Sequence, residues 1–322
     1  MIRLPGALLG LISIMAPTAA HAQSMAEASA LLDPADPPAV VRTASDPDNR
    51  ITIPITIGNR GPYAFIVDTG SQRTVVSREL ADRLALSANL PVTVMSMTGK
   101  ARVDTVTVPH FSFGASSVKD IQAPVFLGEH IGGEGLLGLD GLHSKRLILN
   151  FRSGRMEIGP SRKRRSPEHS NAIVVTARSK LGQLILLDSN AEGQKVNVVL
   201  DTGSEYSIGN IALLKRLSRK QKGRFSGPAV MMSVTGATMT GQWGVIRHLH
   251  MGSLKMSNLP VMFAEAAPFA ELGLSKKPAL LLGISALRGF QRVAIDFGAK
   301  RVDFLLPDQG ALEGRQLAAL QP

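Results

Sequence analysis

Two stretches of the chain share one pattern of apolar and polar positions. Residues 51–57 alternate Ile with Thr or Pro, and a Gly-containing turn leads from them to an apolar run at 63–67. Residues 184–187 and 196–200 repeat this order around a second turn. Alternation with a period of two predicts half-buried strands, and the intervening turns predict two β-hairpins.

Each predicted hairpin ends on the same four residue types. The two copies are Asp68, Thr69, Gly70 and Ser71 in the first half and Asp201, Thr202, Gly203 and Ser204 in the second. A single Asp-Thr-Gly arises by chance in roughly one chain in twenty-five of this length. Two copies, each after an apolar run and each followed by Ser, indicate a repeat.

A helix is expected after each copy. Ser77 and Asn210 are cap residues placed nine positions after their aspartates (77 − 68 and 210 − 201), and they predict short helices over 78–86 and 211–217.

Further landmarks recur in the same order. They are glycine-containing turns at 96–100 and 233–237, Leu-Leu-Gly at 136–138 and 281–283, and strand pairs at 147–151 with 155–158 and 293–297 with 301–304. The offset between the halves grows from 133 at the aspartates to 145 at Leu-Leu-Gly, so the second half carries extra residues, including some around 265–277. The order predicts an internal duplication.

The N-terminus is typical of a secretory signal. Arg3 precedes an apolar run at 8–15, and Ala20-His21-Ala22 is a small-residue cleavage pattern, so we expect a signal peptide over 1–22. Residues 23–50, rich in Ala, Pro and Asp, predict an extended leader, either a simple linker or a removable pro-segment.

The remaining boundaries follow from the repeat. We expect a first lobe at 51–160, a basic linker at 161–171, a second lobe at 172–307 and a tail at 308–322. A chain of 322 residues is long enough for two such units.

Composition narrows the compartment and the class. The chain is 44% hydrophobic but only 4% aromatic, and it has no Cys, so a disulfide framework is excluded. No apolar run of about twenty residues occurs in the body of the chain. We therefore expect a periplasmic or secreted protein, released by cleavage near Ala22, whose core needs no covalent cross-links.

The net charge of +11 raises the question of an anionic partner. Removal of Arg3 with the signal leaves 11 − 1 = +10. The basic residues gather at 162–165 and 215–224, without the interleaved aromatic side chains that a base-stacking surface needs. This argues against nucleic acid and leaves a weak electrostatic contact with an anionic membrane surface, or an acidic substrate, open.

From about residue 51 to 306 these landmarks resemble the retropepsin and pepsin group of aspartic proteases. The resemblance implies an all-β fold in which two pseudo-twofold-related, retropepsin-like β-barrel lobes form a pepsin-like bilobal protein with a cleft between them. It makes Asp68 and Asp201 catalytic and places Leu137 with Gly138, and Leu282 with Gly283, behind their loops. The flap hairpins would present Met97, Gly99, Val234 and Gly236; pepsin-type flaps carry a Tyr near the tip, and here the nearby side chains are Met95, Met97 and Met232.

The implied chemistry is peptide-bond hydrolysis without a cofactor or metal. Two carboxylates a few ångströms apart share one proton, so one can activate a water while the other polarises the amide. The threonine hydroxyls would hydrogen-bond across the two loops, and the glycines leave room for close backbone approach. If the hydroxyls of Ser71 and Ser204 donate to the carboxylates, they lower the pKa of the pair, which predicts an acidic optimum.

Several alternatives stay open. The same fold can serve as a catalytically silent peptide- or protein-binding module, and a periplasmic adaptor that works through the basic clusters is a third hypothesis. His248 and His250 face one side of a predicted strand as a possible metal pair, but no third ligand is indicated. Trp243 is interpreted as a packing residue that could also line a subsite. We expect a monomer, an intramolecular pseudo-dimer, acting on extended or unfolded polypeptide.

Overall fold

The computed structural model describes residues 38–307, apart from 115, 143–144, 162–170 and 220–223, and the backbone of 2–8 and 13–14. The expected cleavage site near Ala22, most of the leader, nearly all of the basic linker and the tail at 308–322 lie outside the described residues. No described helix is long and apolar enough to cross a membrane. The mostly β, two-lobed architecture expected from the sequence is confirmed.

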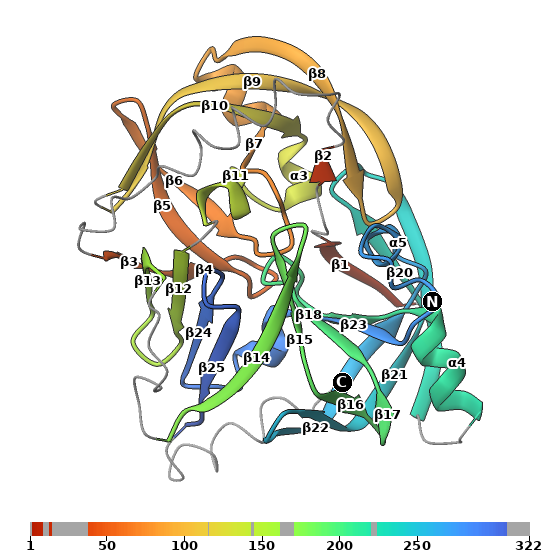
Figure 1. Ribbon diagram of the computed structural model, residues 1–322. Coiled ribbons are helices and arrows are strands. Elements are labelled where there is room, and N and C mark those ends of the chain that lie inside the picture. The colour runs from red at the N-terminus through yellow and green to blue at the C-terminus, as the bar shows by residue number, and fades with distance from the viewer. Residues whose placement is uncertain are drawn as a thin grey trace.

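The first lobe is built on one sheet, drawn in red to yellow at the top of Figure 1. Among the described residues its strand order is β2-β8-β9-β10-β7-β11-β6-β5-β4. These strands are β2 (Ser13–Ile14), β4 (Ala44–Ser45), β5 (Ile51–Ile57), β6 (Arg60–Val67), β7 (Val75–Ser77), β8 (Ser87–Ser96), β9 (Gly99–Phe113), β10 (Ser116–Phe126) and β11 (Gly135–Leu137). The predicted first hairpin is β5 and β6, and the predicted flap hairpin is β8 and β9.

The second lobe repeats this plan in the green to blue half of the chain (Figure 1). Its described strands are β1 (Ile2–Leu8), β15 (Gln183–Leu186), β16 (Ser189–Ala191), β17 (Gln194–Lys195), β18 (Asn197–Leu200), β19 (Ser207–Gly209), β20 (Arg224–Ser233), β21 (Thr238–Met251), β22 (Leu254–Phe263) and β23 (Ala279–Leu282). The predicted second flap hairpin is β20 and β21. Within the expected signal peptide, β1 pairs with β20 and β2 pairs with β8, so the N-terminal segment touches both flap hairpins.

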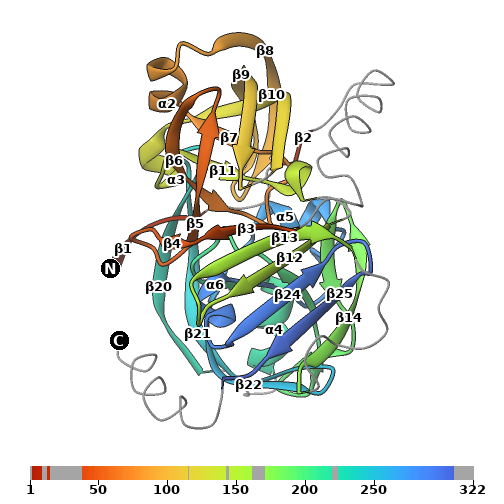
Figure 2. The same cartoon turned by 90° about the vertical axis from the view of Figure 1, so that its left-hand side faces the viewer.

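A layer of six described strands joins the two halves. In order they are β3 (Ala39–Arg42), β13 (Arg155–Pro160), β12 (Lys145–Asn150), β24 (Arg292–Asp296), β25 (Arg301–Leu305) and β14 (Ile173–Lys180). Figure 2 shows these strands side by side below the first lobe. Antiparallel pairing of β12 with β24, centred on Ile148 and Ala294, makes the last strands of each half direct neighbours. The duplication therefore closes through a shared sheet.

The registers around the two Asp-Thr-Gly copies are equivalent. In the first lobe β11 runs parallel to β6 and antiparallel to β7, which pairs in parallel with β10. In the second lobe β23, β18, β19 and β22 have the same relations. Val67 lies opposite Leu137, and Leu200 opposite Leu282. Each Leu-Leu-Gly thus lies behind its own loop.

The helices are short and sit at the lobe surfaces. They are α2 (Arg78–Arg83), α3 (Gly128–Ile131), α4 (Ile211–Arg219), α5 (Ala267–Glu271), α6 (Ile284–Leu287) and the 3-10 helix η1 (Leu139–Gly141). Both predicted caps are confirmed, because Ser77 Oγ accepts from Leu80 N at 3.1 Å and Asn210 Oδ1 accepts from Leu213 N at 2.9 Å. The extra residues of the second half include α5, which follows β22.

Candidate active site

Two matching loops deliver the aspartates at the ends of β6 and β18. Asp68 N donates to Leu137 O at 3.0 Å, and Asp201 N donates to Leu282 O at 3.1 Å. A run of buried apolar residues precedes each aspartate, so each loop starts from a fixed strand end. The parallel neighbour strand therefore continues to hold the backbone at the aspartate itself.

The glycines behind the loops are required by close backbone approach. A Cβ on Gly138 would lie 2.4 Å from the backbone carbonyl of Arg73, and one on Gly283 would lie 2.6 Å from that of Tyr206. These distances are shorter than van der Waals contact, so a larger residue would push the chain away from the loop. The Leu-Leu-Gly repeat therefore has a steric cause.

The two loops are tied to each other through their threonines. Thr69 N donates to Thr202 Oγ1 at 3.0 Å, and Thr202 N donates to Thr69 Oγ1 at 3.1 Å. The hydroxyl of Thr69 donates to Leu200 O at 3.2 Å, and that of Thr202 donates to Val67 O at 2.7 Å. All four bonds cross between the lobes and are buried, so the relative position of the aspartates is fixed.

The two aspartates meet in a closed environment. Asp68 and Asp201 are both 0% exposed. Asp68 Oδ1 accepts from Gly70 N at 2.7 Å and Ser71 N at 3.0 Å, and Asp201 Oδ1 accepts from Gly203 N at 3.2 Å. Within the described part of the chain, both Oδ2 atoms are buried without a hydrogen-bond partner. Each carboxyl thus keeps one oxygen for a bound molecule.

Each carboxyl also lies against the opposite loop. A Cβ on Gly70 would be 2.6 Å from Asp201 Oδ1, and one on Gly203 would be 2.3 Å from Asp68 Cγ. Only glycine leaves the space that the neighbouring carboxyl fills. The four residues therefore form one unit from two chain segments 133 residues apart (201 − 68).

Burial controls the proton affinity of the pair. It raises the pKa of Asp68 from 3.8 to about 6, opposed by the backbone N–H groups of Gly70 and Ser71 and by the charge of Arg50. Burial, followed by the charge of Asp68, raises the pKa of Asp201 well above 3.8. Two such carboxyls hold one proton between them over a range of pH, because both cannot ionise at this separation.

The serine hydroxyls do not act as expected. Ser71 Oγ donates to Arg73 O at 2.7 Å and Ser204 Oγ donates to Tyr206 O at 2.8 Å, so neither hydroxyl reaches a carboxylate. The hydroxyls stabilise the turns that follow the glycines, and their expected lowering of the pKa is wrong. What Ser71 gives Asp68 is its backbone N–H.

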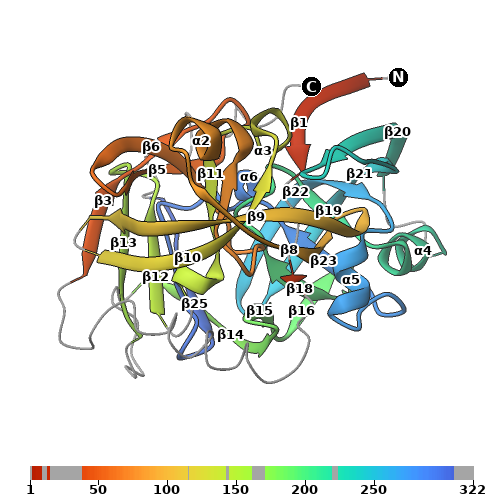
Figure 3. The same cartoon turned by 90° about the horizontal axis from the view of Figure 1, so that it is seen from above.

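The flap tips cover the site from both sides. Met97 and Val234 are each 0% exposed, and Thr98 Oγ1 lies 3.4 Å from Thr235 Oγ1. Ala267 N, at the start of α5, donates to Met97 O at 2.9 Å. Figure 3, seen from above, shows the first flap hairpin extending over the second lobe.

The two flap glycines have different surroundings. Gly99 has a φ of +123° and open space around it, whereas Gly236, at +78°, lies against His130 of α3. The two flaps are therefore not equivalent in their contacts.

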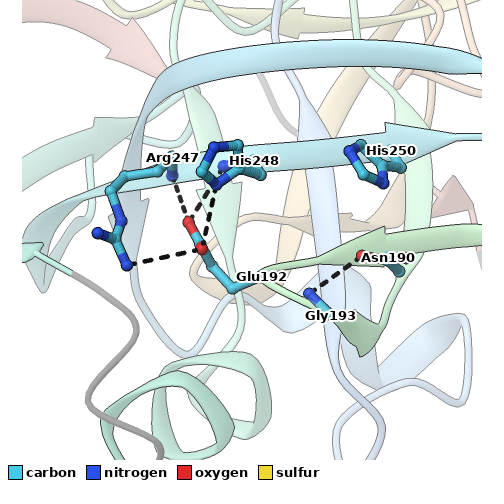
Figure 4. A pocket seen from close by; sticks show the side chains of 6 residues that line it. All are labelled: Asn190, Glu192, Gly193, Arg247, His248 and His250. Atoms are coloured by element: carbon cyan, nitrogen blue, oxygen red, sulfur yellow. Dashed lines mark hydrogen bonds and ion pairs between the residues drawn. The ribbon is translucent and has the colours of Figure 1, made fainter.

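The histidine pair of β21 lies in a separate surface pocket (Figure 4). His248 Nδ1 is 3.6 Å from Glu192 Oε2, while Glu192 Oε1 accepts from Arg247 N at 2.5 Å and His248 N at 3.1 Å. His250 lies beside His248 and opposite Asn190. The carboxylate anchors the β16–β17 turn to β21, and no group of three metal-ligating side chains gathers within the described residues.

Two positions that the sequence reasoning missed touch the catalytic loops. Gln183 Nε2 donates to Gly70 O at 2.8 Å from the opposite lobe, and Arg50 is completely buried beside the site. Each precedes its aspartate by 18 residues (68 − 50 and 201 − 183), a repeat in position that could have indicated them. Trp243 packs edge-on against Tyr206, with ring centroids 5.2 Å apart.

Sequence comparison gives this geometry a family. A profile described as "Aspartyl protease" matches residues 53–140 and 188–286, one region in each lobe. No curated protein matches the chain at a significant level. The matched regions cover more than half of the chain and contain both Asp-Thr-Gly loops, both flap hairpins and the Leu-Leu-Gly segments. The chain therefore belongs to the aspartyl protease family, with two retropepsin-like lobes fused in one polypeptide.

Proposed function

We propose that this protein is an exported aspartic endopeptidase that cuts extended polypeptides with the Asp68 and Asp201 pair. The observation that carries the proposal is the pair itself: two fully buried carboxyls, each pressed against the opposite Asp-Thr-Gly loop and each with one oxygen unpartnered among the described residues. A purely structural turn would be expected to satisfy both oxygens of such a buried carboxyl.

The reaction follows from one shared proton. The ionised carboxyl takes a proton from a water molecule, which attacks the carbonyl carbon of the peptide bond, while the protonated carboxyl donates to the carbonyl oxygen. The tetrahedral intermediate then collapses, the C–N bond breaks, and the amine leaves with a proton from the pair. The threonine exchange between the loops keeps the carboxyls at a fixed separation throughout.

Substrate main chain would pair with the flap hairpins by strand addition. Removal of residues 1–22 would take β1 and β2 away from β20 and β8 and leave these flap strands as edges. Release into the periplasm or medium, a monomeric state and the absence of nucleic-acid partners complete the proposal.

The second candidate is a peptide-binding module without catalysis. The closure of both flaps over the pair favours it, since Met97 and Val234 are completely buried and leave the site covered.

One experiment separates the two functions. The protein lacking residues 1–22, its Asp201→Asn variant and its Asp68→Asn variant are incubated with an unbiased peptide mixture from pH 3 to pH 8, and cleavage is followed by mass spectrometry. Cleavage by the parent chain that both variants lose supports the protease. Binding of peptides without cleavage, equal in all three proteins, supports the binding module instead.

A further inference from the structure

Arg50 and Gln183 occupy equivalent places in the two lobes. The ladder of β5 and β6 pairs Thr52 with Ile66, and that of β15 and β18 pairs Ile185 with Val199. Continuing each ladder by two residues places Arg50 opposite Asp68 and Gln183 opposite Asp201. Residues directly opposite each other in an antiparallel pair project on the same face.

The neutral member of the pair shows what this position does. Gln183 is 1% exposed, and its Nε2 donates to Gly70 O, in the loop that lies against Asp201. Next to it, Gln72 Nε2 donates to Leu181 O at 3.2 Å. The segment before β15 therefore fastens the catalytic loop of the opposite lobe through uncharged groups.

In the other lobe the same position carries charge. Arg50 is 0% exposed, its Nε donates to Asp46 Oδ2 at 2.6 Å, and its Nη2 lies 3.3 Å from Asp48 Oδ2. Glu205, which follows Asp201 by four residues as Gln72 follows Asp68, is close enough for Asp48, Arg50 and Asp46 to affect its pKa.

Neighbouring elements hold this charged cluster in place. Arg288, at the end of α6, donates to Asn49 O and Ser45 Oγ, both at 2.7 Å, and fixes the segment from the second lobe. Gly132, after α3, packs directly against Arg50 Nη2. The guanidinium is therefore anchored from both lobes.

We propose that Arg50 is a positioning residue that makes the pair of aspartates unequal: its buried positive charge, replaced by a neutral amide at Gln183, keeps Asp68 as the ionised member and leaves the shared proton on Asp201. Asp68 is then the group that takes a proton from water, and Asp201 donates to the substrate carbonyl. This inference rests on the proposed protease function for its meaning in catalysis, although the proton assignment itself does not.

The proton affinities of the two carboxyls agree with this direction. Of the charged groups in the cluster, Arg50 lowers the pKa of Asp68, whereas Asp46 and Asp48 act on Glu205. Asp201 has no comparable cation, and the charge of Asp68 raises its pKa further. A fixed cation at one carboxyl and none at the other gives a coupled pair a preferred protonation state.

The test replaces the charge and follows the acidic limb of kcat/KM. Arg50→Gln, which makes the first lobe like the second, should move this limb to higher pH by about one unit, so that kcat/KM one unit below the parent limb falls several-fold, up to about tenfold. Arg50→Lys keeps the charge and should restore most of the shift. Gln183→Met, which breaks the bond to Gly70 without changing charge, should leave the limb in place even if kcat falls.

A second readout keeps the inference testable without turnover. Carboxyl-carbon NMR titration of Asp68 in the parent and in Arg50→Gln should show the same upward shift. If Arg50→Gln does not fold, Asp48→Asn removes a negative charge beside Arg50, and the limb and the titration should move to lower pH. Unchanged titration of Asp68 in the folded variants, or a Lys variant that behaves like the Gln variant, overturns the inference. A parent protein that cleaves nothing overturns the proposed function instead, and the NMR titration still decides the role of Arg50.

Discussion

Met97 and Val234 are exchanged between the lobes: each sits at the tip of its own flap and is buried in a cluster of apolar side chains from the other lobe. Met97 packs with Met231, Phe269 and other second-lobe residues, and Val234 packs with first-lobe residues that include Ile131. The flaps of the closed molecule are thus held down by ordinary hydrophobic burial, which substrate entry must reverse.

Met97→Ala should loosen the closed state. The change removes buried apolar surface and should cost about 2–5 kcal/mol of stability. It should also increase native-state hydrogen exchange at both flap turns, 96–100 and 233–237. Met156→Ala removes another completely buried methionine from the main core, so it should lose comparable stability without a selective change at the flaps. Equal exchange at the flaps in the two variants would contradict the latch.

Thr202→Val tests the threonine exchange. Valine keeps the shape but leaves Thr69 N without its acceptor and Val67 O without its donor. Buried groups left unpaired should cost about 2–4 kcal/mol in urea unfolding. Thr202→Ser keeps the hydroxyl and should retain most of that stability. Similar losses for Val and Ser would show that packing of the methyl group, rather than the hydrogen bonds, is what matters.

The aspartate pair should trade stability for chemistry. Because folding raises the pKa of Asp68 from 3.8 to about 6, its contribution to stability is favourable below the unfolded value and is lost as the pH rises through about 6. At pH 7 the ionised carboxyl then costs on the order of 3 kcal/mol. Asp68→Asn should therefore stabilise the fold at pH 7 and much less at pH 4, as measured by urea unfolding at both values.

Asp82→Asn is the control for that comparison. Asp82 lies on the exposed side of α2, and its substitution should change stability by less than about 0.5 kcal/mol. A parent protein that is equally stable relative to Asp68→Asn at pH 4 and pH 7 would argue against a strained carboxyl pair.

The same pKa values set the pH range of cleavage. Asp68 must be ionised, so kcat/KM should fall below about pH 6, by about tenfold per unit. It should fall again at higher pH, where Asp201 loses the proton that it donates. A full pH–rate profile measures both limbs, and undiminished activity at pH 4 would contradict this reading of the site.

Gly203→Ala should separate structure from catalysis. Its Cβ would lie 2.3 Å from Asp68 Cγ, so the carboxyls must move apart. Displacement of about 1 Å can cost about 10²-fold in rate, and we expect at least that loss in kcat/KM. Gly227→Ala, in β20, has no atom within 4 Å of its Cβ and should keep the parental rate. Parental activity of Gly203→Ala would show that the close contact is not needed.

The sequence by itself determined the repeat, and with it most of the fold. Alternating Ile and Thr placed β5, two Asp-Thr-Gly copies placed the loops, and Ser77 and Asn210 placed the helix caps. These features are local: side-chain periodicity, cap chemistry and glycine geometry act within a few residues of the chain. Their common order in both halves then predicted two related lobes.

Only the tertiary structure decided the contacts between the lobes. The sequence did not show that Met97 and Val234 exchange places, that β12 pairs with β24, or that the hydroxyls of Ser71 and Ser204 turn away from the carboxylates toward their own loops. It also gave Arg50 and Gln183 no role, because a polar residue before a strand is usually solvated. Their burial depends on where the opposite lobe lies, and that placement is set by packing between segments more than a hundred residues apart, which no local pattern encodes.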